Sequence, residues 1–118
     1  MHYTLLYNET STEIGRRDTP EDPAYWGAWN ADVGAMSAAG VMIGDNGLMP
    51  PRTATTLRIT DGTWQVEDGR FADIKEQLGG DVVIDVADLD AALEWAAPAP
   101  CTTAGSVEVR PVMTQPAQ

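Results

Sequence analysis

The sequence predicts an α+β fold in which two helices cover one face of a four-stranded antiparallel sheet. The chain has 118 residues, the usual size of a single domain built around one core. Its hydrophobic content of 43% and charged content of 21% are typical of a folded protein. Strand-like and helix-like patterns follow one another in the order β-α-β-β-α-β, which is the ferredoxin-like arrangement.

The first expected element is a strand over residues 3–7, because this stretch is short and rich in aromatic residues. Alternation places on one of its faces Tyr3, Leu5 and Tyr7. Residues 8–22 are polar and include Gly15 and Pro20, so they predict a loop. The pair Arg16–Arg17 lies in this loop, where we expect both side chains to be solvated.

A helix is expected to begin at Asp22, which can cap free backbone N–H groups, with Pro23 at the first helical position. Gly40 predicts its end. An apolar stripe at helical spacing contains Trp26, Trp29, Val33 and Met36. Such a stripe most often packs in a core. The alternative is an aromatic platform for a ligand, made of Tyr25, Trp26 and Trp29.

The middle of the chain predicts mainly strands. Residues 41–43 form a brief extended piece. Residues 55–60 alternate, and residues 63–66 return as a partner strand after the tight-turn signal Asp61–Gly62. The most hydrophobic strand is expected over residues 82–86, with a central place in the sheet.

The last third predicts a second helix and a final strand. Asp88 is expected to cap the helix, and Pro98 and Pro100 prevent it from continuing. Its inward side carries Leu89, Ala92, Leu93 and Ala96. Residues 106–112 predict the last strand, in which Pro111 is typical of a sheet edge.

The expected core between helices and sheet contains Trp29, Val33, Leu57, Ile84 and Leu93. We expect one domain over residues 1–113 and a disordered tail over residues 114–118. The face of the sheet away from the helices has no cover. A second copy of the sheet is the simplest cover, so the pattern predicts a homodimer.

Charge and composition exclude several classes of function. The net charge of −11 argues against binding to nucleic acid or to anionic membranes, which requires clustered Lys and Arg. No signal peptide or membrane-spanning run is present, so a cytoplasmic protein is expected. Cys101 is the single cysteine, and no histidine lies near it in sequence. It therefore predicts neither a disulfide nor a nucleophile.

No metal or other cofactor is expected. One histidine and one cysteine are too few for a structural zinc site. An acidic cluster consists of Glu67, Asp68, Asp73 and Glu76. Its spacing differs from that of an EF-hand, and such a cluster is most often a solvated loop.

The stretch from Glu67 to Gly80 is polar, contains three glycines and is longer than a hairpin turn requires. We expect it to form structure of its own or to serve as a binding loop. Its run Asp68-Gly69-Arg70-Phe71 resembles the Asp-Gly-Pro-Phe signature of the DGPF proteins, a branch of the YCII-related family, with Arg70 in place of proline. The resemblance covers almost the whole chain and includes residues 53–56, 75–80, 84–86, 92–96 and 105–111.

The resemblance implies a ferredoxin-like subunit that pairs into a dimeric α+β barrel. It also implies a small-molecule-binding protein, one form of which is a cofactor-free enzyme of lyase, isomerase or monooxygenase type. The alternative is a non-catalytic partner or regulatory module, because DGPF relatives are often encoded near extracytoplasmic-function sigma factors. Some family members carry a His–Asp pair in a cleft. This chain departs from them, since His2 is its only histidine.

Alternation also predicts a polar group on the uncovered face of the sheet. If the apolar residues of the strands face the helices, the side chains that face away are Arg58, Asp81, Asp85, Glu108 and Arg110. In a functional site, Arg110 would bind an anionic group and Asp81 would act as general base. Arg58, Asp85 and Glu108 would complete the ligand-binding pocket. The alternative is a set of structural ion pairs across strands or across the dimer.

Overall fold

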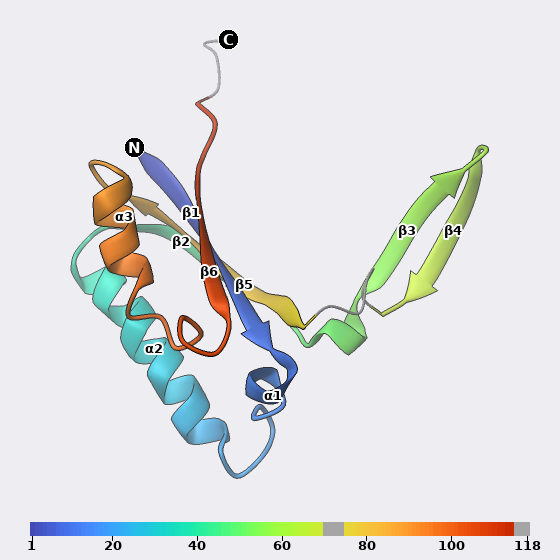
Figure 1. Cartoon of the computed structure of the whole chain (residues 1–118), viewed down its shortest axis with the longest axis horizontal. Coiled ribbons are helices and arrows are strands. Elements are labelled where there is room, and N and C mark those ends of the chain that lie inside the picture. The colour runs from blue at the N-terminus through green and yellow to red at the C-terminus, as the bar shows by residue number, and fades with distance from the viewer. Residues whose placement is uncertain (70–74, 115–118) are drawn as a thin grey trace.

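The computed structural model describes residues 1–69 and 75–114 (Figure 1). The main sheet contains the strands β1 (His2–Thr10), β2 (Met42–Gly47), β5 (Glu76–Asp85) and β6 (Ser106–Pro111). Their spatial order is β2-β5-β1-β6, and all neighbours are antiparallel. Helix α2 (Asp22–Ala38) links β1 to β2, and α3 (Leu89–Ala96) links β5 to β6. The predicted ferredoxin-like subunit is therefore confirmed.

The two central strands are longer than the sequence pattern indicated. β1 continues to Thr10 and is followed by the single-turn helix α1 (Ser11–Ile14). β5 begins at Glu76, so the last part of the stretch predicted as a long loop is strand. Residues 70–74 of that stretch lie outside the described residues, as do residues 115–118 of the predicted tail. The central place of β5 and the edge place of β6 with Pro111 are confirmed.

The start of α2 differs from the prediction. Asp22 is the first helical residue and not the cap, which is Glu21 and makes no side-chain capping bond. The Asp22 carboxylate instead accepts hydrogen bonds from the Asp18 N–H at 2.7 Å and from the Trp26 indole at 3.1 Å. The end of the helix is as predicted, because Gly40 adopts a φ of 75°, which glycine reaches without strain.

Helix α3 begins as predicted. The Asp88 carboxylate accepts a hydrogen bond from the Ala91 N–H at 2.9 Å. Only the small residues Ala92 and Ala96 of this helix are buried. Leu89 and Leu93 are each 48% exposed, so their predicted inward placement is wrong. Helix α3 thus packs on the core through the buried Ala92 and Ala96 and the partly buried Trp95, while its leucines stay on the outer side.

The core fills the space between the two helices and one face of the main sheet. Ile84 belongs to it as predicted, and Trp29 and Val33 pack against it partly buried. The most deeply buried side chains of the cluster belong to Leu5, Met36, Val82, Ile84, Ala92 and Cys101. Each lies on the sheet face toward the helices or on an element packed against that face. The opposite face has no cover within the described chain.

The strands β3 (Thr55–Thr60) and β4 (Thr63–Asp68) form a separate two-stranded sheet. Asp61 and Gly62 both have positive φ, as the predicted tight turn requires. The hairpin follows the short 3-10 helix η1 (Pro51–Thr53) and projects away from the main sheet (Figure 1). The prediction that Leu57 faces the core is therefore wrong, and the second strand of the main sheet is β2.

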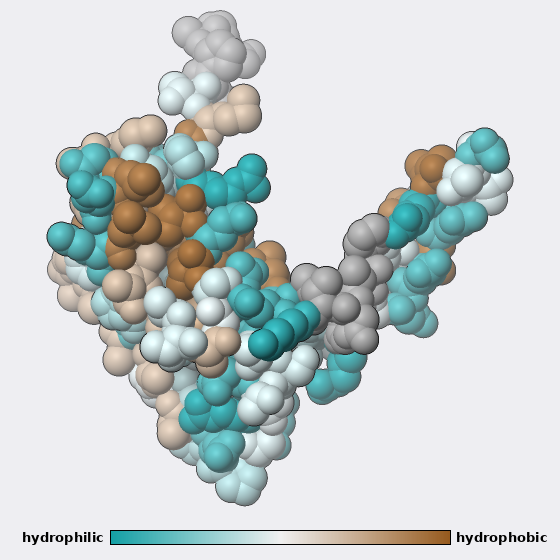
Figure 2. All heavy atoms as spheres, in the orientation of Figure 1, coloured by the Kyte–Doolittle hydropathy of each residue, from teal (hydrophilic) through white to brown (hydrophobic). Residues whose placement is uncertain are grey.

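One face of the hairpin is apolar. The register pairs Leu57 with Val66 and Ile59 with Trp64, so these four side chains share a face. They are 49–69% exposed. Figure 2 shows hydrophobic atoms on the projecting hairpin and a second group over the outer side of α3. A lone two-stranded hairpin is marginally stable in water, so packing of this apolar face against another surface would stabilise it.

None of the helices in the described part of the chain combines the length and the apolar character needed to cross a bilayer.

A matched pair of leucines tests the corrected core. Leu5→Ala should lower the free energy of unfolding by about 2–5 kcal/mol, because Leu5 is fully buried in β1. Leu93→Ala should change it by about 0.5 kcal/mol, as is usual for a surface position. Urea unfolding followed by circular dichroism measures both. Equal losses for the two variants would contradict the placement of α3.

Candidate functional site

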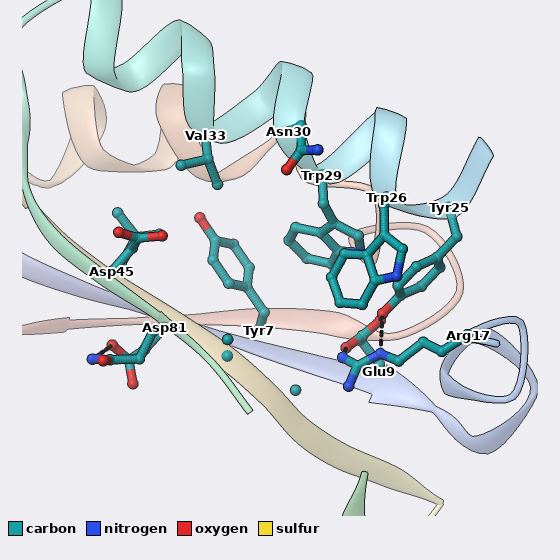
Figure 3. Close-up of a pocket in the computed structure, with 15 residues that line it drawn as sticks. Tyr7, Glu9, Arg17, Tyr25, Trp26, Trp29, Asn30, Val33, Asp45 and Asp81 are labelled. Carbon is teal, nitrogen blue, oxygen red and sulfur yellow. Dashed lines mark hydrogen bonds and ion pairs between the residues drawn. The ribbon is translucent and has the colours of Figure 1, made fainter. Parts of the chain in front are cut away.

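The candidate site is a pocket of about 130 Å³ between α2 and the helix-facing side of the main sheet (Figure 3). Strands β1, β2 and β5 form its floor, and α2 forms its roof. The side chains that give it its character are Tyr7, Glu9, Trp26, Trp29, Val33 and Asp45. The pocket therefore combines aromatic walls with ionisable groups at its two ends.

Glu9 forms one end of the pocket and is only 2% exposed. It follows Tyr7 by two positions in β1, so its carboxylate lies on the helix-facing side. Arg17 Nη2 donates to Glu9 Oε2 at 3.1 Å, and the Tyr25 hydroxyl donates to Glu9 Oε1. Burial, followed by the hydrogen bond to Glu9, raises the pKa of Tyr25, so this hydroxyl stays protonated and remains a donor.

The guanidinium of Arg17 has several partners within the protein besides Glu9. Its Nε donates to the Tyr25 hydroxyl at 3.0 Å, and its Nη1 donates to the Leu48 carbonyl at 2.7 Å. The guanidinium also lies 5.0 Å from the centre of the Trp26 ring, within range of a cation–π contact. Its side chain is 8% exposed, so the prediction that Arg17 is solvated is wrong. Each of the three guanidinium nitrogens of Arg17 thus donates a hydrogen bond within the protein.

Gly79 makes room for the Glu9 carboxylate. The pairing of β1 with β5 shifts register between Tyr7 and Asn8, which leaves Gly79 as an extra residue in β5. A Cβ atom built on Gly79 would lie 1.8 Å from Glu9 Oε2. Any larger residue at this position would displace the carboxylate. Gly79 of the predicted signature stretch thus makes room for the buried ion pair, whereas a Cβ atom on Gly80 would meet the backbone of β2 at Asn46.

Tyr7 stands in the middle of the pocket, with its hydroxyl pointing toward Val33 and Asp45 (Figure 3). It is 3% exposed, and its ring packs edge-to-face on Trp29 at 4.9 Å. Its hydroxyl has no hydrogen-bond partner in the described residues. Burial raises the pKa of Tyr7, and the charge of Asp32 raises it further. The hydroxyl is therefore protonated, buried and open to a partner.

Asp32 of α2 is a second buried polar group near Tyr7. Its Oδ2 also has no hydrogen-bond partner in the described part of the chain. Burial raises the pKa of this carboxyl group. Cys101 lies in the same region and is 1% exposed, and burial raises the pKa of its thiol to about 12. The thiol is thus protonated at neutral pH, which agrees with the prediction that it is no nucleophile.

Four of the five predicted site residues lie on the opposite, uncovered face of the main sheet. The register places Asp81 and Glu108 on either side of Leu6, and Arg110 beside Thr4. Asp81 is also one of the residues that line the pocket, although the register directs its side chain away from α2. Asp85 pairs with His2, which faces the same side of the sheet as Thr4 and Leu6. The fifth residue, Arg58, lies on β3 in the separate hairpin, so its predicted place on this face is wrong.

The charged groups of the uncovered face already have partners. Asp81 accepts a hydrogen bond from the Asn46 side chain at 3.2 Å. Asp85 accepts one from the N-terminal ammonium group at 2.9 Å, and this bond lowers the pKa of Asp85. Arg110 lies 3.9 Å from Glu108, and both are largely exposed. In the single chain these charged groups form exposed ion pairs or, for Asp81, a hydrogen bond to an amide. The predicted roles of these residues stay predictions.

Sequence reasoning missed Glu9 and Arg17 and left Tyr7 without a role. One signal could have found Glu9, because it continues the alternation of Tyr3, Leu5 and Tyr7 and therefore belongs to the buried face. For the three aromatic residues of α2, the sequence left two interpretations open, core packing and an aromatic platform for a ligand. All three, Tyr25, Trp26 and Trp29, line the pocket.

Comparisons with known proteins give one family and one fold. The family model described as YCII-related domain matches residues 1–115. An uncharacterised protein of Rhizobium meliloti (strain 1021) is 48% identical over 69 residues, which are 55% of this chain and 54% of the relative. The matched part thus spans about half the length of that relative.

A solved structure gives the likeness in fold. It is that of 5-chloro-2-hydroxyhydroquinone dehydrochlorinase (TftG) from Burkholderia phenoliruptrix AC1100, in complex with 2,5-dihydroxybenzoquinone. The two structures align with a TM-score of 0.55, over 98% of this chain and 96% of the other. Their sequences are 15% identical, so the likeness concerns the fold alone.

Two neighbouring arginines test the buried network. Arg17→Ala should lower the free energy of unfolding by about 3–5 kcal/mol, because it leaves the Glu9 carboxylate buried without its counter-charge. Arg16→Ala should lower it by about 1 kcal/mol or less. Arg16 makes a pair of the same 3.1 Å length with Glu13, but that pair is in contact with solvent. Urea unfolding compares them, and a larger loss for Arg16→Ala would contradict the assignment.

Proposed function

The chain belongs to the YCII-related domain family, and from this premise we propose that it binds a small molecule in the pocket between α2 and the sheet. The observation that carries the proposal is a buried tyrosine hydroxyl that has no hydrogen-bond partner in the described chain, on a residue that lines an aromatic pocket. Native proteins rarely leave a buried polar atom unpaired. A bound ligand or a water would satisfy it.

The pocket has room for one ring. Its volume of about 130 Å³ is close to the cavities of about 150 Å³ that hold a benzene molecule. Trp26, Trp29 and Tyr7 offer aromatic faces and edges against which a planar ring can pack. TftG, which has the same fold, was solved with a dihydroxylated six-membered ring. We infer that a hydroxylated six-membered ring is the class of ligand.

Cofactor-free chemistry of lyase, isomerase or monooxygenase type is the enzymatic form of this proposal. Tyr7 and Asp45 are the groups that can exchange a proton with a ligand in the pocket. The predicted pair of Asp81 as base and Arg110 as anion-binding group forms a second candidate site, on the uncovered face. That site would be enclosed only if a second copy of the chain covered it.

We also propose that the chain forms a homodimer by pairing the uncovered faces of two main sheets. The face carries the apolar side chains of Leu6 and Val83, and next to them Leu78 and Val112, each 41% exposed. This face also carries the guanidinium of Arg110 and the carboxylates of Asp81 and Glu108, so a two-fold pairing can bring opposite charges of the two copies together. The result would be the dimeric α+β barrel that the resemblance implies.

The hairpin supports the alternative role of a regulatory or partner-binding module. Its apolar face of Leu57, Ile59, Trp64 and Val66 is exposed and projects from the body of the protein. Exposed apolar surface of this kind is typical of a protein contact. A second copy of the chain or a different protein would provide that contact. The two roles are compatible, since the pocket and the hairpin are separate.

Titration with hydroquinone tests the ligand proposal. We expect isothermal titration calorimetry to detect binding of one hydroquinone per chain. Trp26→Ala should weaken it about 2- to 10-fold, the equivalent of the ~0.5–1.5 kcal/mol of an aromatic contact. Trp64→Ala is the control, because Trp64 lies on the hairpin, and it should bind with unchanged affinity. Equal weakening in both variants, or no binding to the parent protein, would refute the pocket assignment.

Light scattering tests the dimer. The parent protein at micromolar concentration should have the mass of two chains. Leu6→Glu should produce a monomer, because it adds a charge to the apolar centre of the uncovered face, between Asp81 and Glu108. Leu89→Glu is the control on the outer side of α3 and should stay dimeric. A monomeric parent protein would refute the dimer, and a monomer only in Leu89→Glu would assign the interface to the helical side.

A further inference from the structure

The pocket is chemically asymmetric. At the Glu9 end, the carboxylate, the guanidinium of Arg17 and the hydroxyl of Tyr25 satisfy one another. That end has a paired charge and little capacity left for a ligand. At the other end, the Tyr7 hydroxyl is buried and has no partner in the described residues. Asp45 also borders the pocket there, on the same side of the sheet as Tyr7 (Figure 3).

The register explains why Tyr7 and Asp45 lie on the same side of the sheet. Asp45 pairs with Val82 across β2 and β5, and Val82 pairs with Leu5 across β5 and β1. Paired residues share a face, so Asp45 lies on the helix-facing side with Leu5 and Tyr7. The next residue of β2, Asn46, pairs with Asp81 and faces the opposite way. Asp81 also lines the pocket, but the register directs its side chain away from α2, whereas the Asp45 side chain is directed toward α2.

These two groups have complementary hydrogen-bonding capacities. A protonated tyrosine can both donate and accept, whereas an ionised aspartate can only accept. A ligand hydroxyl can accept a hydrogen bond from Tyr7 and donate its own proton to Asp45. A ligand carboxylate has no proton to donate, and its charge meets the negative charges of Asp45 and of the nearby Asp32. Arg17 lies at the other end of the pocket, where its charge is already paired with the Glu9 carboxylate.

We propose that Tyr7 and Asp45 together read a neutral hydroxyl group on the ring of the ligand, and that the pocket rejects ring carboxylates. This inference rests on the proposed function of the pocket and adds the orientation and charge of its ligand. Tyr7 is then a specificity-determining residue. The ring lies between Trp26 and Trp29 with its hydroxyl toward the end formed by Tyr7 and Asp45.

Three probes of similar size, hydroquinone, toluene and benzoate, separate recognition of the hydroxyl group from rejection of the carboxylate. For the parent protein, calorimetric titration should give the tightest binding for hydroquinone and the weakest for benzoate. Tyr7→Phe should weaken hydroquinone binding about tenfold, as the loss of one buried hydrogen bond does, and leave toluene binding unchanged. Asp45→Asn should strengthen benzoate binding relative to hydroquinone by about threefold or more.

Tyr3→Phe is the matched control. It also removes a hydroxyl from the helix-facing side of β1, but Tyr3 does not line the pocket and its hydroxyl donates to Met1 Sδ. It should bind all three probes as the parent protein does. Unchanged hydroquinone affinity in Tyr7→Phe, or benzoate binding tighter than hydroquinone in the parent protein, would overturn this inference and leave the proposed function intact. Binding of none of the probes would overturn both.

Discussion

The buried ion pair of Glu9 and Arg17 is the interaction on which the geometry of the pocket depends. A carboxylate that is 2% exposed cannot stay ionised without a counter-charge and hydrogen-bond donors, because desolvation strongly disfavours a lone charge. Arg17 supplies both, and its other donors reach Tyr25 of α2 and the Leu48 carbonyl beyond β2. One guanidinium thus links the end of β1, the first turn of α2 and the segment after β2. The bulge at Gly79 is the cost of this arrangement in β5, since only glycine leaves space for the carboxylate.

The satisfied state of this network determines what the rest of the pocket can do. Because Glu9, Arg17 and Tyr25 use one another, they form a rigid end wall, and the aromatic rings of Trp26 and Trp29 form apolar sides. The remaining polar capacity is concentrated at Tyr7 and at the neighbouring acidic groups. A pocket of this kind favours a ligand with a single polar end. It also opposes an anionic ligand, which is the reverse of the chemistry that Arg110 predicted for the other face of the sheet.

The sequence could predict the order of elements, because strand alternation, helix spacing and caps such as Asp88 and Gly40 are local signals. It could not predict that β3 and β4 leave the main sheet, because sheet membership depends on pairings between residues far apart in the chain. The prediction placed Leu93 in the core because leucine is more hydrophobic than alanine. In the structure the buried residues of the helix are Ala92 and Ala96. The residues of the pocket were harder to predict from the sequence than the fold. Arg17 lies in the loop between α1 and α2, and no local pattern shows that its side chain reaches Glu9 of β1 and the carbonyl of Leu48.

The two faces of the main sheet differ in what they lack, and this difference argues for the helix side as the ligand site. On the uncovered face, Asp85, Glu108, Arg110 and Asp81 have partners or lie in contact with solvent, so a ligand there would have to displace existing interactions. On the helix side, the buried hydroxyl of Tyr7 has no hydrogen-bond partner in the described chain. An unpaired buried polar group is costly, so a ligand that pairs with this hydroxyl gains a hydrogen bond without displacing an existing one. The same strand serves both faces: β5 turns Val82 and Ile84 toward the helices and Asp81 and Asp85 away from them. If two chains paired through the sheet face that carries Asp81 and Asp85, the pocket on the helix-facing side would therefore stay open.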